Sequence, residues 1–285
     1  MSAHELDHVA FAVPAWSPAG ELLNRELGAR FASGFSLPAF SPCQVALAED
    51  MRLELLEPGS SPASFIKRFL ADNGGNAAPH HITFKVHDIS AAMAAARAAG
   101  INPILANTEH PLWQEAFLHP RDTGLGFLVQ MVHTPQSLEQ ITADNDEFTI
   151  PCPWPETEVS RARLPVVFGL VRDLERAGRV LLSVLGATGF PLPVLPRGEP
   201  AAAGFRWPQG ADLILQESAD SPGISGLRAL GYAAAGEPAL GPEHPGLLEA
   251  LVAGPFVPEL GIRISSLRLP DPPGSVRHPV HQTTT

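Results

Sequence analysis

The 285-residue sequence has few cysteines, few basic residues and no long apolar run. Its two cysteines, Cys43 and Cys152, are too few for a disulfide framework or a cysteine zinc site. Nineteen basic residues against 30 acidic ones give a net charge of -11, which disfavours binding to nucleic acid or to an anionic membrane surface. No segment approaches the roughly 18 apolar residues of a membrane span, and the opening MSAHELDH lacks the features of a signal peptide. We therefore expect a cytoplasmic protein that binds neither nucleic acid nor membrane.

The apolar content of 45% is sufficient for one large or two ordinary domains with buried cores. Proline accounts for 30 residues and is concentrated after Thr134. The stretch 136–163 carries several acidic residues and prolines and is typical of a linker. The tail 271–285 has no apolar period, so we expect it to be disordered.

The first part of the chain contains two copies of one pattern of strands and a helix. A strand over 6–13 precedes a helix over 17–27 and strands near 43–48 and 51–56, and the order restarts with a strand over 80–86. Aligning LDHVAFAV with PHHITFKV places His8 on His81, and aligning MRLELLE with GFLVQMV places Glu54 on Gln130. These two alignments predict two repeats of a βαβββ unit.

The second part of the chain repeats the same pattern less completely. A strand over 164–171, a helix over 173–187 and a strand over 212–217 form a third copy, and a shorter fourth copy lies beyond them. The fold class is therefore α+β, with paired βαβββ modules in a cupped mixed sheet and a second, degenerate copy of that arrangement.

Four polar residues, His8, Glu54, His81 and Gln130, share equivalent strand positions in the first two modules. Singly, a strand histidine is more often a hydrogen-bonded structural residue, and Glu54 is more often solvated. Together they offer two imidazoles, one carboxylate and one amide oxygen, a set that suits a divalent ion of the manganese to zinc series. Four buried polar groups without such a role would be costly.

The phrases LDHVAFAV, MRLELLEP, NGGNAAPHHITFKVHDISAAMAAARAAGI and AFLHPRDTGLGFLVQMV resemble the vicinal oxygen chelate (glyoxalase/bleomycin resistance/dioxygenase) superfamily, and within it methylmalonyl-CoA epimerase. The resemblance covers about residues 4–135. It implies that residues 1–135 form a metal-binding domain with His8, Glu54, His81 and Gln130 as ligands. Residues 164–270 would form a metal-free, glyoxalase-like domain, since Val166 and Ile214 occupy ligand positions there.

The resemblance implies a metal-dependent isomerase, epimerase or lyase acting on a small carbonyl or thioester substrate through an enolate-like intermediate. Its cofactor would be one divalent ion, Zn, Co, Ni, Mn or Fe, and Glu54 would be the catalytic carboxylate. Gln130 replaces a glutamate of the epimerase pattern, and an amide accepts no proton at neutral pH. An Fe(II)-dependent dioxygenase and a non-catalytic binding protein remain alternatives, the first because two histidines and a carboxylate also suit that iron chemistry.

Two aromatic residues are candidates for contact with the substrate. Trp113 lies in the segment EHPLWQEAF. The resemblance implies that Phe40 or Ser41 occupies a second acidic position of the epimerase pattern. The degenerate copy would also supply a partner surface within the chain. We therefore expect either a monomer with an internal pseudo-dimer or a homodimer.

Overall fold

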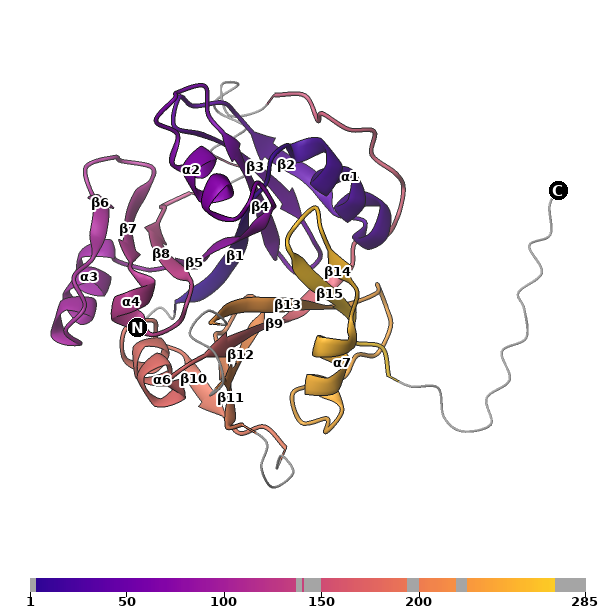
Figure 1. Ribbon diagram of the computed structural model, residues 1–285. Helices are drawn as coiled ribbons and strands as arrows, with labels where there is room; N and C mark the ends of the chain where they lie inside the picture. The colour runs from indigo at the N-terminus through magenta and orange to yellow at the C-terminus, as the bar shows by residue number, and fades with distance from the viewer. Residues whose placement is uncertain (1–3, 137–139, 141–149, 194–199, 219–224, 270–285) are drawn as a thin grey trace, which may run out of the picture.

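The computed structural model describes residues 4–136, 140, 150–193, 200–218 and 225–269. Two mixed sheets dominate this part of the chain, and helices flank both (Figure 1). The predicted α+β class with paired modules is confirmed. The tail expected at 271–285 lies outside the described residues, as do positions 137–139 and 141–149 of the expected linker. No helix in the described ranges is long and apolar enough to cross a membrane.

The first sheet contains eight strands in the order β2-β3-β4-β1-β5-β8-β7-β6. Strand β1 pairs in parallel with β4 and antiparallel with β5, and β5 pairs in parallel with β8. The two modules thus meet at the central β1–β5 pair. Their elements are β1 (Glu5–Ala12), α1 (Trp16–Leu27), β2 (Arg30–Gly34), β3 (Phe40–Ala46), β4 (Arg52–Pro58), α2 (Phe65–Asp72), β5 (Ala78–Lys85), α3 (Ile89–Ala98), β6 (Ile104–Asn107), β7 (Gln114–Leu118), α4 (Pro120–Thr123) and β8 (Leu128–His133).

The second sheet contains seven strands in the order β10-β11-β12-β9-β13-β15-β14. Its central β9–β13 pair is antiparallel, and β9 pairs in parallel with β12, as β1 does with β4. The predicted helix over 173–187 ends at Ser183, because the chain turns at Gly186 and β10 begins at Thr188. The elements are β9 (Arg163–Val171), α6 (Leu174–Ser183), β10 (Thr188–Phe190), β11 (Ala202–Arg206), β12 (Asp212–Glu217), β13 (Gly226–Ala233), α7 (Leu247–Ala253), β14 (Phe256–Val257) and β15 (Ile262–Ser266).

One hydrophobic cluster joins the N-terminal half (residues 4–136) to the C-terminal half (residues 163–269). Val9 and Phe84 from the first sheet belong to the same buried cluster as Leu164 and Leu213 from the second. The ring of Phe84 lies 4.9 Å from that of Trp207. The two halves therefore share a core and do not behave as independently solvated units.

The two sheets differ in what covers the face opposite this shared core. In the first sheet, that face carries His8, Glu54 and His81, and α2 packs on it only at one end through Ile66 and Leu70. In the second sheet, an apolar cluster under α7 fills the corresponding face. Register places Val166, Ile214, Ala229 and Ser265 where the first sheet has His8, Glu54, His81 and Gln130.

Candidate metal centre

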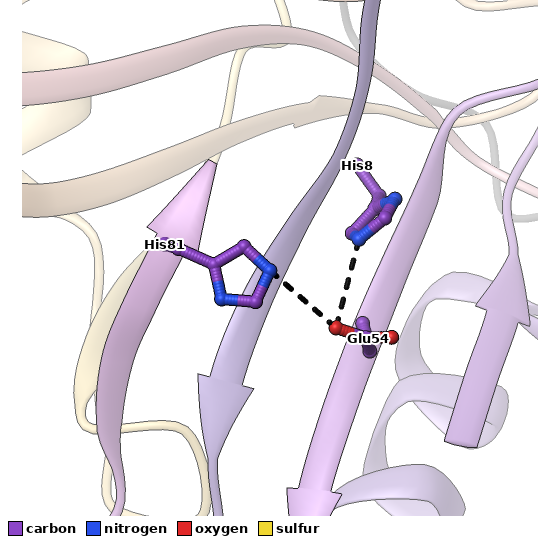
Figure 2. Close-up of side chains that lie close together, drawn as sticks. All are labelled: His8, Glu54 and His81. Carbon is purple, nitrogen blue, oxygen red and sulfur yellow. Dashed lines mark ion pairs between the residues drawn. The ribbon is translucent and has the colours of Figure 1, made fainter. Parts of the chain in front are cut away.

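Three side chains from three adjacent strands converge on the open face of the first sheet. His8 comes from β1, Glu54 from β4 and His81 from β5, and one ligand atom of each lies within 4.8 Å of the others. The Nε2 atoms of both histidines lie 3.6 Å from Oε2 of Glu54 (Figure 2). Both imidazoles are almost fully buried, whereas the Glu54 side chain is 13% exposed.

Strand register explains this convergence. In the parallel β1–β4 pair, Ala10 is opposite Glu54, and in the antiparallel β1–β5 pair it is opposite His81. Side chains alternate along a strand, so His8 lies on the same face as its neighbour-but-one Ala10. The small Ala10 side chain leaves room for all three polar side chains to approach one another.

Gln130 on β8 joins this group from the neighbouring strand. Its Oε1 lies 3.1 Å from Nε2 of His81 and accepts a hydrogen bond of 2.6 Å from the Thr83 hydroxyl. Oγ1 of Thr83 also lies 2.9 Å from Nε2 of His8. The structure therefore brings together all four residues that the sequence singled out as ligand candidates.

Two carboxylates outside the ligand set form hydrogen bonds with His8 and Gln130. Oδ2 of Asp7 lies 2.7 Å from Nδ1 of His8, and Asp7 is itself paired with Arg52. On the other side, Nε2 of Gln130 donates a 2.7 Å hydrogen bond to Oε2 of Glu115. These contacts direct Nε2 of His8 and Oε1 of Gln130 toward the centre, where a metal ion would bind.

The pKa values of the two histidines are shifted in opposite directions. Burial alone disfavours the charged form of His8, but its hydrogen bond with Asp7 and the nearby Glu54 carboxylate raise its pKa to about 9. Burial, together with the neighbouring His80 and His8, holds the pKa of His81 well below its usual range. Burial opposes ionisation of Asp7, yet His8 and Arg52 lower its pKa to about 2.

The geometry fits a divalent metal ion. Donor atoms about 2.1 Å from one ion lie about 3.0–3.4 Å apart in octahedral or tetrahedral coordination. The observed separations of 3.1 and 3.6 Å need only small side-chain adjustments to reach that range. Two imidazole nitrogens, one carboxylate and one amide oxygen also match the preference of borderline divalent ions.

The two aromatic candidates lie away from this centre. Trp113 donates its indole N–H to Oε2 of Glu115 at 3.0 Å, so it is linked to Gln130 through that carboxylate. Phe40 packs on Phe65, with 5.3 Å between ring centroids, in the apolar cluster under α2. Neither ring directly contacts the three inner ligand candidates among the interactions recorded for the described residues.

Sequence reasoning missed three functional neighbours of the centre: Asp7, Thr83 and Glu115. Thr83 follows His81 by two positions, so alternation along β5 could have placed it on the same face. The sequence pattern gave less indication that Asp7 and Glu115 would lie near the centre. Their positions depend on a bulge in β1 and on the pairing of β7 with β8.

Residues 7–117 match the family model described as the Glyoxalase/Bleomycin resistance protein/Dioxygenase superfamily. The chain is also similar to 4-hydroxymandelate synthase from Streptomyces coelicolor in a variant form, with a TM-score of 0.58, 13% identity and coverage of 82% of this chain and 72% of that one. Methylmalonyl-CoA epimerase from Mycobacterium tuberculosis is similar at a TM-score of 0.42 and 23% identity, over 49% of this chain and 91% of that one. A comparison with curated proteins gave no match. The family match thus lies within the N-terminal half, and the likeness to 4-hydroxymandelate synthase extends the shared fold to both halves.

Proposed function

We propose that this chain is a metal-dependent isomerase, epimerase or lyase that acts on a small carbonyl or thioester substrate. The observation that carries the proposal is the convergence of His8, Glu54 and His81 within 4.8 Å on one open sheet face. Gln130 would be a fourth ligand through Oε1. We also propose that residues 1–135 form the metal-binding domain and residues 164–270 a metal-free one, joined by 136–163.

A bound divalent ion would supply Lewis-acid stabilisation of the negative charge that develops on a carbonyl oxygen when a neighbouring proton leaves. Glu54 is the carboxylate of the inner set, so we assign it the role of proton acceptor, ligand or both in turn. Gln130 cannot accept that proton, and Glu115 holds its amide in place. Asp7 fixes the orientation of the His8 ring.

Exchange of a substrate proton with solvent tests this proposal directly. Wild-type protein loaded with Zn²⁺, Co²⁺ or Mn²⁺ is incubated in D₂O with small thioesters and 2-oxo acids, and deuterium incorporation is followed by NMR. Glu54→Gln should slow exchange by about 10²–10⁴-fold because an amide accepts no proton. Glu21→Gln, at an exposed position of α1 outside the site, serves as the control and should retain the wild-type rate. An unchanged rate in Glu54→Gln would remove both roles assigned to that residue.

An Fe(II)-dependent dioxygenase is the second candidate, because two histidines and one carboxylate form the ligand set of many non-haem iron oxygenases. Consumption of oxygen by the Fe²⁺-loaded protein, together with a substrate, would favour it over a redox-neutral enzyme. Tight ligand binding without any product would instead favour the third alternative, a non-catalytic binding protein.

A further inference from the structure

A pocket of about 280 Å³ lies beside the candidate metal centre, and the mechanism proposed above does not use it. Its wall on the first sheet includes Gln44, Arg52 and Lys85. Gln209 and Gly210 from the C-terminal half and Arg161 from the connecting segment complete it. The pocket thus lies where the two halves meet.

The strand register connects this pocket to the metal centre. Arg52 precedes Glu54 by two residues on β4, and Lys85 follows Thr83 by two residues on β5, so all four side chains share one face. Gln44 is directly opposite Glu54 in the β3–β4 pair. Two residues along a strand span about 7 Å, so a molecule a few carbon atoms long has the length to reach from the centre to the pocket.

Two buried polar atoms at the pocket have no hydrogen-bond partner in the described part of the chain. They are Oε1 of Gln44, whose residue is only 7% exposed, and Nε of Arg52. Buried polar atoms are normally satisfied, so each of these is suited to a ligand group. Lys85 adds a cation that forms no ion pair within 4.0 Å in the described ranges, and its charge helps to lower the pKa of Asp7.

Four acidic residues, Glu5, Asp7, Glu49 and Asp50, also line the pocket, and one of them neutralises Arg52. Asp7 is already bound to Arg52 and His8. Glu49 is exposed and lies 3.9 Å from Arg163, and Asp50 is exposed. Glu5 is half-buried at the first position of β1, opposite Lys85 in register, without an ion pair to it among the described residues. Donor groups therefore remain available on the side of the pocket nearest the centre.

We propose that this pocket binds a second carboxylate of the substrate, so that the substrate class is a small dicarboxylic acid. Its chelating oxygens would lie at the metal centre, and the distal carboxylate would receive hydrogen bonds from Arg52 and Lys85. A hydroxyl or amide N–H near that carboxylate would donate to Gln44. The chain length between the two ends is a few carbon atoms. This assignment rests on the proposed function.

The C-terminal half closes one side of the pocket through Gln209 and Gly210. The carbonyl of Gln209 accepts a hydrogen bond of 3.3 Å from the backbone N–H of Leu6. Gly210 has a φ of +90°, and a Cβ there would overlap the Leu6 carbonyl, so only glycine allows this close approach. The degenerate half therefore supplies one wall of the substrate pocket even though its own sheet face is filled by apolar side chains.

Calorimetric titration of the Zn²⁺-loaded protein tests the assignment with a matched pair of probes. 2-Oxoglutarate and 2-oxovalerate have the same chelating end and chain length, but only the former has a distal carboxylate. We expect the wild type to prefer 2-oxoglutarate by about tenfold or more. Lys85→Gln should reduce this preference to within about threefold. The only other lysine of the chain, the exposed Lys67, provides the control, and Lys67→Gln should retain the full preference.

A chemical footprint separates failure of this assignment from failure of the metal site. Acetylation of the two lysines by a limiting amount of reagent is measured by mass spectrometry, with and without metal and over a titration with 2-oxoglutarate. The acid should slow acetylation of Lys85 by about tenfold at ten times its Kd and leave Lys67 unchanged. Protection of Lys85 in a protein that binds no metal would support the pocket and overturn the metal site.

Three results would overturn the assignment of the pocket. They are equal affinity of the wild type for the two probes, a preference that survives in Lys85→Gln, and acetylation of Lys85 that is unaffected up to the solubility limit of the acid. If Lys85→Gln is poorly folded, the footprint of the wild type decides alone.

Discussion

Asp7 and Glu115 show how single residues outside the ligand set prepare the candidate metal centre. Asp7 lies against Nδ1 of His8, which leaves Nε2 directed toward Glu54. Glu115 accepts from the amide nitrogen of Gln130, which directs the amide oxygen toward His81. Such outer partners fix ring and amide orientation before a metal ion binds, so less ordering is needed on binding.

Asp7→Asn should weaken metal binding by about 10–100-fold, because the amide is uncharged and supports the His8 ring less strongly. The affinity for Zn²⁺ is measured by competition with a chelator. Asp50→Asn is the matched control. Asp50, like Asp7, lines the pocket that contains Lys85, but its side chain is exposed. Equal affinities for Asp7→Asn and the wild type would show that the Asp7–His8 contact does not contribute to the centre.

Helix α7 illustrates, at the scale of an element, why the second sheet has no polar centre. Leu247 and Leu251 from this helix pack on Val166, Ile214 and Ala229, which occupy three of the positions equivalent to ligand candidates. The fourth position holds Ser265, whose hydroxyl donates to the carbonyl of Leu251 at 2.8 Å. The sheet face that is open in the N-terminal half is thus a hydrophobic core in the C-terminal half.

Leu251→Ala should lower the free energy of unfolding by about 2–5 kcal/mol, because it leaves a cavity in this core. The next residue, Val252, is 50% exposed, so Val252→Ala should change stability by no more than about 0.5 kcal/mol. Urea unfolding measures both variants. The metal content of Leu251→Ala should remain that of the wild type, and its loss would contradict the separation of the two sheet faces.

The whole molecule is held together by contacts that repeat on the two sides of its pseudo-symmetry. The start of β5 meets the start of β15 at Ala77 and Gly261, and the start of β8 meets the start of β13 at Gly126 and Gly226. Gly261 has a φ of +65°, and a Cβ there would overlap the Ala77 carbonyl oxygen. The two halves therefore pack too closely for side chains at these positions.

Gly261→Ala should destabilise the protein more than Gly75→Ala by about 1–3 kcal/mol. Both glycines have positive φ, so both substitutions share the cost of a left-handed backbone, but a Cβ at Gly75 would meet no atom within 4 Å. Thermal unfolding of the two variants isolates the contact between the halves. Equal destabilisation would show that the halves can separate locally without cost.

The repeat of the strand and helix pattern made most of the fold predictable from the sequence. The alignment of His8 with His81 and of Glu54 with Gln130 also identified the residues that converge, because equivalent strands meet in one sheet. Short strands such as β10 and β14 lacked a sequence signal, since two or three residues show no clear alternation.

Contacts that depend on register and irregularity could not be predicted. Asp7 approaches His8 and Arg52 at a bulge of β1 between Leu6 and His8. The amino-acid sequence of this segment alone does not indicate a bulge. Glu115 reaches Gln130 only because β7 pairs with β8 with Phe117 opposite Gln130. The packing of Gln209 on Leu6 depends on the relative placement of two halves that are distant in sequence.

The metal content of the purified protein shows directly whether His8 and His81 hold a divalent ion. The experiment compares the wild type with His8→Ala, His81→Ala and Val166→Ala. Each protein is dialysed against Zn²⁺ and desalted, and its zinc content is measured by elemental mass spectrometry. We expect about one ion per chain in the wild type and in Val166→Ala, and little or none in the two histidine variants, because each loses a nitrogen ligand. A full equivalent of metal in the histidine variants, or none in the folded wild type, would contradict this expectation.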